Sequence, residues 1–414
     1  MESPDPKRRR VTYGSWSRLA INILIDVASK HVTSAATYTA LRSVCRSWRA
    51  AVPATVPAPH RLPPQLPFLL LFTRRPRDPT GPAFSLATNR TIALRHLYDS
   101  HQSICVGSCY GWVLLLDHRY NLILRNPFTG DTIRLPTLDG TPALDPRPSG
   151  GRAICPYKDK LLFEHHFIVH RAILSSDPSA DRRFLVVLFP GTSISRCFTW
   201  RSGDNFWTVC RHPSFLPEEI IFYEDRRCIA ISPDGECAVF NFSTADGDDG
   251  FFTRVPKLPV SGSPFLVESA GNVWLVMVKR TTPEEEAQIA ICRLDFSSLP
   301  DKVIAVSQCG DLGGRIMFLE QCNSMSVAST HFPGLEGDSV YFTETNWRSL
   351  KYWRDTYWRS LKYWRDTYTT TIWECQLKKG IIARRHSFEG ESGLHTLWPR
   401  LWWVPPNLHK KLGE

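Results

Sequence analysis

Glu164, His165, His166 and His170 have the side chains from which zinc sites are built. They lie in the segment EHHFIVHR (164–171), and zinc in proteins is held by His nitrogens and carboxylate oxygens. A helical zinc site needs two His ligands four residues apart and a third ligand from elsewhere. This segment instead alternates in the way of a strand, so we predict no metal site here.

Three further patterns resemble ligand-binding or catalytic motifs without completing them. The segment ADGDDG (245–250) has the Asp-rich start of a calcium loop but lacks the ordered ligand spacing and the final Glu. The segment GDLGG (310–314) is not followed by the Gly-Lys-Ser/Thr of a phosphate-binding loop. No Gly-x-Ser-x-Gly nucleophile elbow occurs. We therefore predict a chain that is not an enzyme in its own right and needs no cofactor.

The positions of the cysteines do not indicate a framework of disulfides or metal sites. They occur at 45, 105, 109, 155, 197, 210, 228, 237, 292, 309, 322 and 375. No Cys-x-x-Cys pair is present, and most lie in apolar runs where a reduced Cys behaves as a small hydrophobe. The N-terminus has no apolar stretch behind it, and the run FLLLF (68–72) is far shorter than the roughly 20 residues that span a bilayer. We expect a soluble intracellular protein with reduced thiols and no membrane partner.

The net charge of +10 raises nucleic acid as a partner, but the basic residues are scattered and do not indicate one. The one tight basic run consists of Lys7, Arg8, Arg9 and Arg10. This run is read either as a nuclear-import signal or as a solvated tail. The localisation we expect is therefore the cytoplasm, the nucleus or both.

A short helical segment begins the ordered part of the chain. One apolar stripe at helical spacing contains Leu19, Ile23, Leu24 and Val27. A second helix is predicted over 37–52, TYTALRSVCRSWRAAV, and Pro53 ends its pattern. Two or three short helices in about 40 residues bury too little surface to be very stable alone. Part of their apolar surface is therefore completed either by a partner or by the chain's own core.

From Leu66 onward, short apolar strands alternate with Gly, Pro, Asp and Asn turns. Examples are GWVLLLD (111–117), LILRNPFTGDTIRLP (122–136), RFLVVLF (183–189) and the hairpin FLVESAGNVWLVMV (265–278) around Gly271-Asn272. Such strands, with no long helical pattern between them, indicate an all-β sandwich, barrel or propeller. About 340 residues at roughly 40–50 residues per blade predict a propeller of about seven blades.

The segment WRSLKYWRDTY occurs twice without a difference, at 347–357 and 358–368. Three explanations compete: a binding loop in which basic and aromatic residues alternate, one or two helical turns, and a recent in-frame duplication in a tolerant loop. The perfect identity favours the duplication, or an equivalent gene-model error. As an exposed binding loop the segment would present Trp347, Tyr352, Trp353, Trp358, Tyr363 and Trp364.

The helical segment resembles an F-box, the motif that docks onto the Skp-type adaptor of cullin-based SCF ubiquitin ligases. The resemblance covers 16–53 and is most specific in LRSVCRSWRAAVP (41–53), which is similar to the last helix of plant members. The family has a Leu-Pro pair at the start of the first helix, where this chain has Leu19-Ala20. The resemblance implies adaptor contacts among Leu19, Leu24, Leu41, Val44, Cys45 and Trp48.

The strand-rich part resembles the kelch-like, KIB-type β-propeller of plant F-box proteins. The motifs that carry this resemblance are GSCYGWVLLLD (107–117), HRAILSSDP (170–178), FLVESAGNVWLV (265–276), FLEQCNSMSVASTHFPGLEGDSVYFTE (318–344) and LWPRLWWVPP (397–406). The resemblance implies that the propeller presents a protein target to the ligase, whose cullin is reached through the adaptor. It does not identify the target.

The sequence thus predicts a short all-α F-box segment followed by an all-β propeller, together forming a substrate receptor. The expected parts are a disordered basic tail (1–13), F-box helices (14–54), a Pro-rich linker (55–65), the propeller (66–406) and a tail (407–414). Two other hypotheses stay open. One is a stand-alone propeller that binds RNA or an acidic protein, and the other is a decayed receptor whose F-box no longer binds its adaptor.

Overall fold

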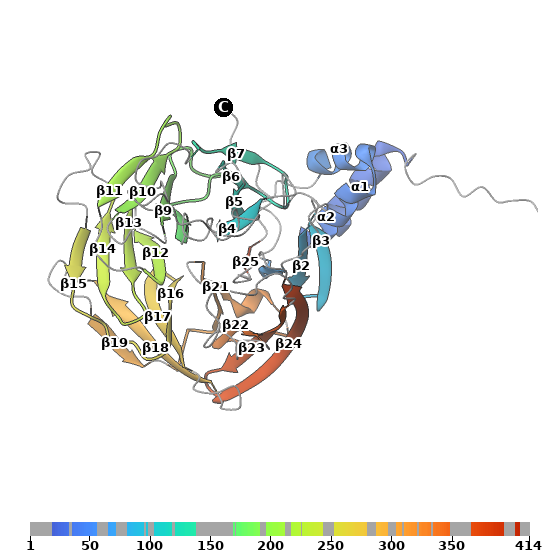
Figure 1. The fold of residues 1–414 in the computed structure, drawn as a ribbon. Coiled ribbons are helices and arrows are strands. Elements are labelled where there is room, and N and C mark those ends of the chain that lie inside the picture. Colours follow the sequence, from blue (N-terminus) through green and yellow to red (C-terminus); the bar gives the residue numbers. More distant parts are fainter. Residues whose placement is uncertain are drawn as a thin grey trace, which may run out of the picture. The chain divides into compact units, whose positions relative to one another are not determined.

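The chain divides into two compact units, Met1–Gln65 and Leu66–Glu414. The first is helical and the second is built from β-strands (Figure 1). The computed structural model describes residues 19–32, 35–55, 65–71, 81–94, 97, 103–117, 121–137, 169, 171–190, 196–211, 217–224, 226–242, 252–279, 287–296, 304–308, 310–320, 323–332, 334–347, 366–392 and 402–405.

The described part of the first unit contains the helices α1 (Ile21–His31), α2 (Ala35–Val44) and α3 (Arg46–Thr55). The single helix predicted over 37–52 is wrong, because the chain breaks at Cys45 between α2 and α3. The expected end at Pro53 is also wrong, since α3 continues to Thr55. Proline lacks the N–H that would bond the Arg49 carbonyl. That carbonyl instead accepts a hydrogen bond from Arg42 Nη1 at 3.3 Å.

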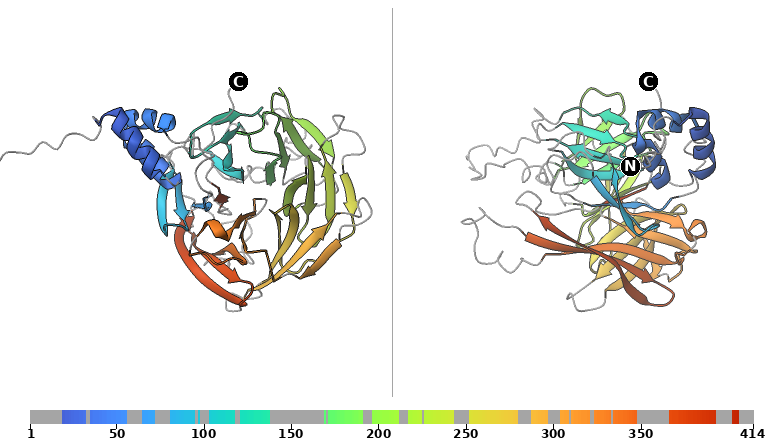
Figure 2. Two further views of the ribbon diagram at one scale, coloured as in Figure 1. Left: turned by 180° about the vertical axis from the view of Figure 1, so that it is seen from behind. Right: turned by 90° about the vertical axis from the view of Figure 1, so that its right-hand side faces the viewer.

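The strands of the described residues form six sheets, which are the blades of a propeller arranged as a ring (Figures 1 and 2). The contacts between sheets are made mainly by one edge strand of each, which is therefore the inner strand. From inner to outer strand, the first blade is β25 (Trp402–Val404), β1 (Phe68–Leu70), β2 (Gly81–Ser85) and β3 (Arg90–Leu94), and the second is β4 (Ile104–Cys109), β5 (Trp112–Leu116), β6 (Leu122–Arg125) and β7 (Thr132–Arg134). The third blade is β8 (Arg171–Leu174), β9 (Leu185–Phe189), β10 (Arg196–Arg201) and β11 (Thr208–Arg211), and the fourth is β12 (Glu219–Glu224), β13 (Arg227–Ile231), β14 (Cys237–Asn241) and β15 (Phe252–Val255). The fifth blade is β16 (Ser263–Ser269), β17 (Asn272–Lys279), β18 (Gln288–Asp295) and β19 (Ile304–Gln308), and the sixth is β21 (Met325–Ala328), β20 (Arg315–Leu319), β22 (Ser339–Trp347), β23 (Asp366–Gln376) and β24 (Ile381–Ser392).

The expectation of about seven blades is wrong, because residues are not shared evenly among the blades. The sixth blade alone runs from Arg315 to Ser392 and contains five strands, with β20 paired parallel to β22. A 3-10 turn (Ser329–His331) lies between β21 and β22. Strands β7 and β8 are separated by residues 135–170, of which 138–168 lie outside the described residues.

The ring is closed by pairing the two ends of the propeller. Strand β25 runs antiparallel to β1, with Trp403 opposite Leu69. Trp403 is fully buried in a cluster that also contains Phe84 of the first blade and Phe318 of the sixth. Its ring centroid lies 5.2 Å from that of Phe318. Closure therefore depends on apolar contacts between the first and last parts of the propeller chain.

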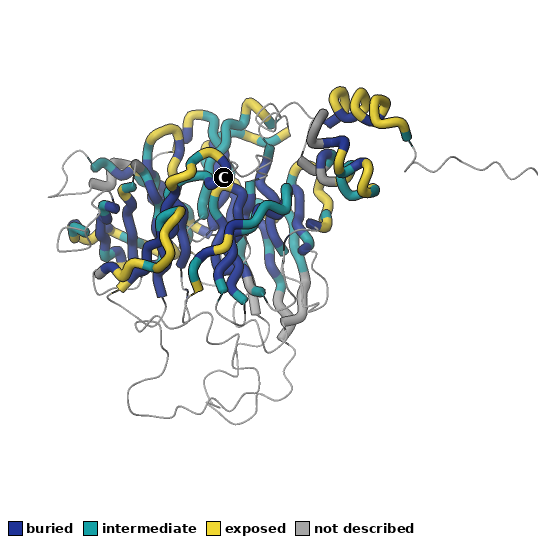
Figure 3. Tube along the Cα trace, turned by 90° about the horizontal axis from the view of Figure 1, so that it is seen from above, coloured by how far each residue is buried: buried dark blue, intermediate teal, exposed yellow. Residues whose placement is uncertain are grey.

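Apolar side chains from neighbouring blades make the core. Strands β5 and β9 are buried along their whole length, as strands covered on both faces should be. In the propeller drawn in Figure 3 the buried residues concentrate in such strands, whereas exposed residues occur mainly in turns and edge strands. The strands expected in 111–117, 122–136 and 183–189 are confirmed.

Two turns show how local chemistry sets the strand ends. The Asn126 side-chain oxygen accepts the N–H groups of Phe128 at 2.9 Å and Thr129 at 3.1 Å, which fixes the bend between β6 and β7. The hairpin expected around Gly271-Asn272 is confirmed, and its two turn residues are Ala270 and Gly271, with φ values of 52° and 74°. Positive φ at both central residues suits the twist of a two-residue hairpin.

The doubled segment runs from the last residue of β22 into the first residues of β23, so its two ends pair with each other across these strands. Trp347, the first residue of the first copy, is opposite Tyr368, the last residue of the second. Residues 348–365 lie outside the described residues. Because the copies are identical, removing one whole copy leaves the same residue types at the end of β22 and at the start of β23.

Deletion of 358–368 is therefore expected to leave the free energy of unfolding unchanged or to raise it by about 1 kcal/mol. Tyr357 would take the place of Tyr368 opposite Trp347, and the connection would shorten to 348–354. A shorter connection costs less closure entropy, by roughly 0.8 kcal/mol for this change in length. Chemical denaturation of the full chain measures the effect.

The matched control is a deletion one residue shorter, 358–367. It places Tyr357 directly before Tyr368, so the residues that precede Tyr368 are shifted by one position relative to the whole-copy deletion. Because side chains alternate between the two faces of a strand, each of these residues would then lie on the opposite face of the sheet. We expect this control to be less stable than the whole-copy deletion. Loss of the folded state in the whole-copy deletion would show that the second copy is needed for the fold.

Candidate adaptor-docking surface

The helical unit has a small core of its own. Leu24 of α1 packs with Trp48 and Ala51 of α3, and all three are buried. Leu19 and Leu41 pack against this core while staying partly exposed. Both α1 and α2 contact α3, so α3 is the element that joins the three helices.

The apolar surface of α1 is wider than this core can cover. A helix turns by about 100° per residue, so the apolar residues of α1 occupy an arc of roughly 200°. Leu24 and Ala28 at its centre are buried. The exposed fractions on either side are Ile21 59%, Ile23 49%, Ile25 36% and Val27 39%. We call these four residues the α1 flanks.

The α1 flanks form two pairs with a spacing of four residues. Ile21 and Ile25 lie on one side of Leu24, and Ile23 and Val27 lie on the other. The opposite face of α1 is polar, and on it Lys30 makes a 2.8 Å ion pair with Asp26. Exposed apolar side chains gathered on one helix are typical of a protein-docking surface.

The six residues expected to contact an adaptor divide into core and surface. Leu24 and Trp48 are buried, with exposed fractions of 1% and 9%. The one member with a mostly exposed side chain is Val44, at 50%. The half-buried members are Leu19, Leu41 and Cys45. The adaptor contact of these residues stays a prediction, and the structure adds the α1 flanks to the candidate surface.

Sequence reasoning missed Ile21 and Ile25 and placed Ile23 and Val27 on the same stripe as Leu24. The width of the apolar arc would have been the usable signal. A helix in a three-helix unit buries one side, so side chains near both borders of a 200° arc cannot all be covered.

Two arginines stabilise the break between α2 and α3. Arg42 Nη1 donates to the Arg49 carbonyl, and Arg49 Nε donates back to the Arg42 carbonyl at 3.1 Å. The Arg42 guanidinium also lies 5.3 Å from the centre of the Tyr38 ring, within the range of a cation–π contact. These contacts supply partners for carbonyls that the broken helix leaves unbonded.

Cys45 lies at the start of α3, where its Sγ is 3.0 Å from the Ser47 Oγ. Hydrogen bonding from the Ser47 hydroxyl, followed by the backbone N–H of Trp48, lowers the pKa of the Cys45 thiol. The Cys45 carbonyl accepts the Arg49 N–H at 3.0 Å. The Cys45 carbonyl therefore accepts the first hydrogen bond of α3. The Cys45 side chain is partly buried and packs against the core of the helical unit.

Ala20 precedes α1 and offers no side-chain cap to it. Its φ of −60° and ψ of 136° are compatible with proline, whose ring holds φ near −65°. Helix α1 thus forms with the backbone geometry that a Leu-Pro pair would favour.

Replacing Ala20 with Pro is expected to stabilise the helical unit by about 0.4–1 kcal/mol, because it restricts the unfolded chain without changing the folded backbone. Hydrogen exchange of the α1 amides in the full chain should slow by a corresponding two- to fivefold. Ala50→Pro, placed inside α3, is the control and should destabilise the unit. Faster exchange of α1 in the Ala20→Pro variant would contradict this expectation.

Several predicted sites lie outside the described residues. This holds for the basic run Lys7 to Arg10, for the segment 164–168 with His170, and for 245–250. In the candidate binding loop it holds for Tyr352, Trp353, Trp358, Tyr363 and Trp364, whereas Trp347 is the last residue of β22.

The Gly-rich segment 310–314 has a structural role. The Asp338 carboxylate accepts the backbone N–H groups of Leu312 at 2.6 Å and Gly314 at 3.1 Å. It also pairs with Lys378 Nζ at 2.7 Å. A phosphate-binding loop must direct such N–H groups at its ligand, and here they are bonded to a side chain of the protein itself.

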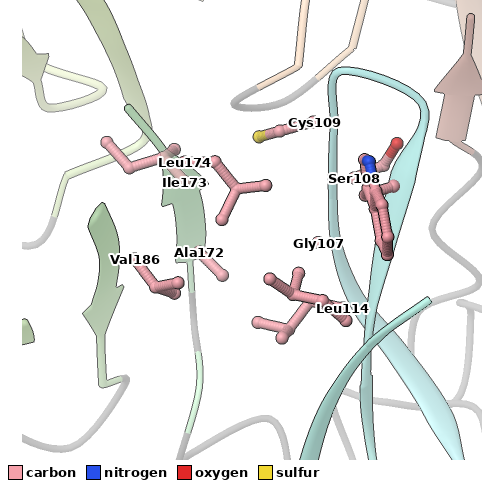
Figure 4. A pocket seen from close by; sticks show the side chains of 10 residues that line it. Gly107, Ser108, Cys109, Leu114, Ala172, Ile173, Leu174 and Val186 are labelled. Carbon is pink, nitrogen blue, oxygen red and sulfur yellow. The ribbon is translucent and has the colours of Figure 1, made fainter. Parts of the chain in front are cut away.

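A small pocket lies between the second and third blades (Figure 4). It is lined by Ser108 and Cys109 on β4 and by Ala172, Leu174 and Val186 opposite them. Its volume of ≈ 10 Å³ admits about one water molecule. Burial raises the pKa of the Cys109 thiol to about 12, so this pocket has neither the space nor an ionised nucleophile for catalysis.

In the part of the chain that the structure describes, no group of three or more His, Cys, Asp or Glu side chains could hold a metal ion. None of the helices in this part is long and apolar enough to cross a membrane.

The chain is similar to F-box proteins of Arabidopsis thaliana. F-box protein At1g10110 is 24% identical over 372 residues, covering 80% of this chain and 85% of the relative. F-box protein KIB3 is 25% identical over 326 residues, covering 73% and 65%. F-box/kelch-repeat protein KIB1 is 27% identical over 231 residues, covering 52% and 51%.

The pattern of the KIB1-4 β-propeller family matches residues 83–368. That match spans all blades, from β2 of the first into β23 of the sixth, and covers more than half of the chain. The chain therefore belongs to the KIB1-4 β-propeller family.

Proposed function

We propose that this chain is the substrate-recognition subunit of an SCF-type ubiquitin ligase. The helical unit docks onto a Skp-type adaptor, which connects it to a cullin. The propeller binds a protein target and holds it for ubiquitin transfer. In this role the chain positions other proteins and performs no chemistry, and it acts in the cytoplasm, the nucleus or both.

The observation that carries the proposal is the exposed apolar surface of α1. Four branched aliphatic side chains, the α1 flanks, are exposed on a single helix of a unit with very few core residues. Exposed Ile and Val cost free energy in water, and a partner that covers them regains it. Val44 of α2 is also exposed and adds to the exposed apolar area of the same unit.

The relatives support the assignment of this surface to an adaptor. The similar proteins of Arabidopsis thaliana are named as F-box proteins, and two alignments cover most of this chain. The F-box resemblance of 16–53 falls on α1, α2 and α3. The propeller follows as a separate compact unit, in keeping with a division between adaptor docking and target binding.

The test is reconstitution of the full chain with a purified Skp-type adaptor and a cullin. We expect the chain to capture the cullin only when the adaptor is present, because the adaptor forms the bridge. Capture of the cullin without the adaptor, or failure of the folded chain to capture the adaptor, would contradict the proposal. In the second case the decayed-receptor hypothesis would stand.

A further inference from the structure

Two cysteines face each other across the outer hairpin of the third blade. Strands β10 and β11 pair antiparallel, with Cys197 directly opposite Cys210. Directly opposed Cα atoms in such a pair lie about 4.5–5.5 Å apart. A disulfide requires a Cα separation of roughly 4.4–6.8 Å. The backbone therefore already has the spacing at which these two residues can be bridged.

The surroundings of the two thiols are mostly apolar and include a third cysteine. Cys197 and Cys210 are buried in the cluster between the third and fourth blades, together with Cys228 of β13. The Thr199 Oγ1 lies 3.6 Å from the Cys210 Sγ. Both Cys197 and Cys228 are fully enclosed, and burial raises the pKa of each thiol well above its usual value.

Cys210 differs from its two neighbours in ionisation and in position. A hydrogen bond from the Cys197 thiol, opposed by burial and helped by Thr199 and Arg201, lowers the pKa of Cys210 to about 7. Cys210 is also on β11, the outer edge strand of its blade. Edge strands open locally more easily than central ones, which gives a small oxidant a route to this sulfur.

We propose that Cys197 and Cys210 are a reversible thiol–disulfide pair that hydrogen peroxide oxidises in the folded propeller. The Cys210 thiolate attacks a peroxide oxygen, the O–O bond breaks, and a sulfenic acid forms with release of hydroxide, which takes up a proton to become water. The Cys197 sulfur then attacks the sulfenic sulfur, forming the S–S bond and releasing a second water. The two thiols lose two electrons and two protons, and peroxide gains them.

The bond ties the edge strand β11 to β10 within one hairpin. Cross-linking residues that are already adjacent restricts the unfolded chain more than the folded one. Oxidation of the full chain is therefore expected to raise the thermal midpoint of the propeller by a few degrees, and a dithiol reductant is expected to reverse the shift.

Tryptic cleavage separates the three candidate thiols, because Arg196, Arg201, Arg211 and Arg227 flank them. Cys197 lies in peptide 197–201 and Cys210 in 202–211, whereas Cys228 lies together with Cys237 in 228–254. The folded full chain is treated with hydrogen peroxide, its remaining thiols are alkylated, and it is digested without reductant. Mass spectrometry is expected to find 197–201 joined to 202–211, with the loss of two hydrogen atoms.

Three variants show which cysteine reacts with peroxide and which cysteine then bonds to it. Cys210→Ser should leave Cys197 unmodified, whereas Cys197→Ser should leave a sulfenic acid on Cys210 that dimedone traps. Cys228→Ser should retain the link. The proposal is overturned if 197–201 joins 228–254 instead, if the folded chain forms no link, or if the link forms as readily in urea, where the strand register is absent.

Discussion

Replacing Trp403 with Ala is expected to lower the free energy of unfolding of the propeller by about 3–5 kcal/mol. Trp403 is fully buried in β25, the short strand that closes the ring against β1. Its backbone carbonyl also accepts a hydrogen bond from Asn323 Nδ2 at 2.6 Å. Truncation would leave a cavity beside Phe318 and Leu69 at the junction between the first and sixth blades. The effect is measured by chemical denaturation of the full chain.

Phe206→Ala is the matched control, because it removes another large aromatic side chain from the same propeller. Phe206 is 80% exposed, and exposed substitutions of this kind change stability by about 0.5 kcal/mol or less. Equal denaturation midpoints for the two variants would contradict the assignment of Trp403 as the closing residue. A large loss for Trp403→Ala alone would locate ring closure in β25.

The second large effect concerns adaptor docking. Replacing Ile23 with Asp is expected to weaken adaptor capture by at least tenfold, because a carboxylate would be buried in an apolar interface at a cost above about 1.4 kcal/mol. Ile23 is 49% exposed, so the helical unit should stay folded. Asp also suits the first turn of a helix, where the helix dipole favours negative charge. The readout is capture of the purified adaptor by the full chain.

Asn22→Asp is the control for charge. It introduces the same carboxylate in the same turn of α1 but on the polar face, and it should leave capture unchanged. Comparing Ile25→Asp with Val27→Asp then shows which of the two pairs of α1 flank residues contacts the adaptor, because Ile25 and Val27 lie on different sides of Leu24. Leu24→Ala is a control for folding, since loss of this buried side chain should unfold the small core and weaken capture indirectly. Unchanged capture by Ile23→Asp, Ile25→Asp and Val27→Asp would exclude the α1 flanks as the docking surface.

Much of the propeller could be predicted because apolar runs mark its strands and turn residues mark where the strands end. The run WVLLL is apolar throughout and becomes β5, buried at every position. Asn is one of the turn residues that separate the expected strands, and Asn126 makes the turn after β6 because its short amide side chain bonds nearby N–H groups. The helical unit was equally visible in the apolar spacing around Leu24. These features depend on contacts between residues close together in the chain.

The errors concern features set by distant contacts or by small local choices. The number of blades depends on how many strands join each sheet, and the parallel pairing of β20 with β22 has no local sign. The break at Cys45 depends on the Arg42–Arg49 exchange of hydrogen bonds, which helical periodicity does not register. The width of the apolar arc of α1 indicates that some of its apolar residues stay uncovered, and the packing of α3 against α1 decides that Ile21 and Ile25 are among them.

The receptor function is tested most directly by a calorimetric titration of the Skp-type adaptor into the full chain at several temperatures. We expect one adaptor per chain and a negative heat-capacity change, because the α1 flanks would leave water on binding. We also expect Ile23→Asp to weaken the affinity and Asn22→Asp to leave it unchanged. Absence of binding by a chain whose three helices are folded would contradict the proposed receptor function.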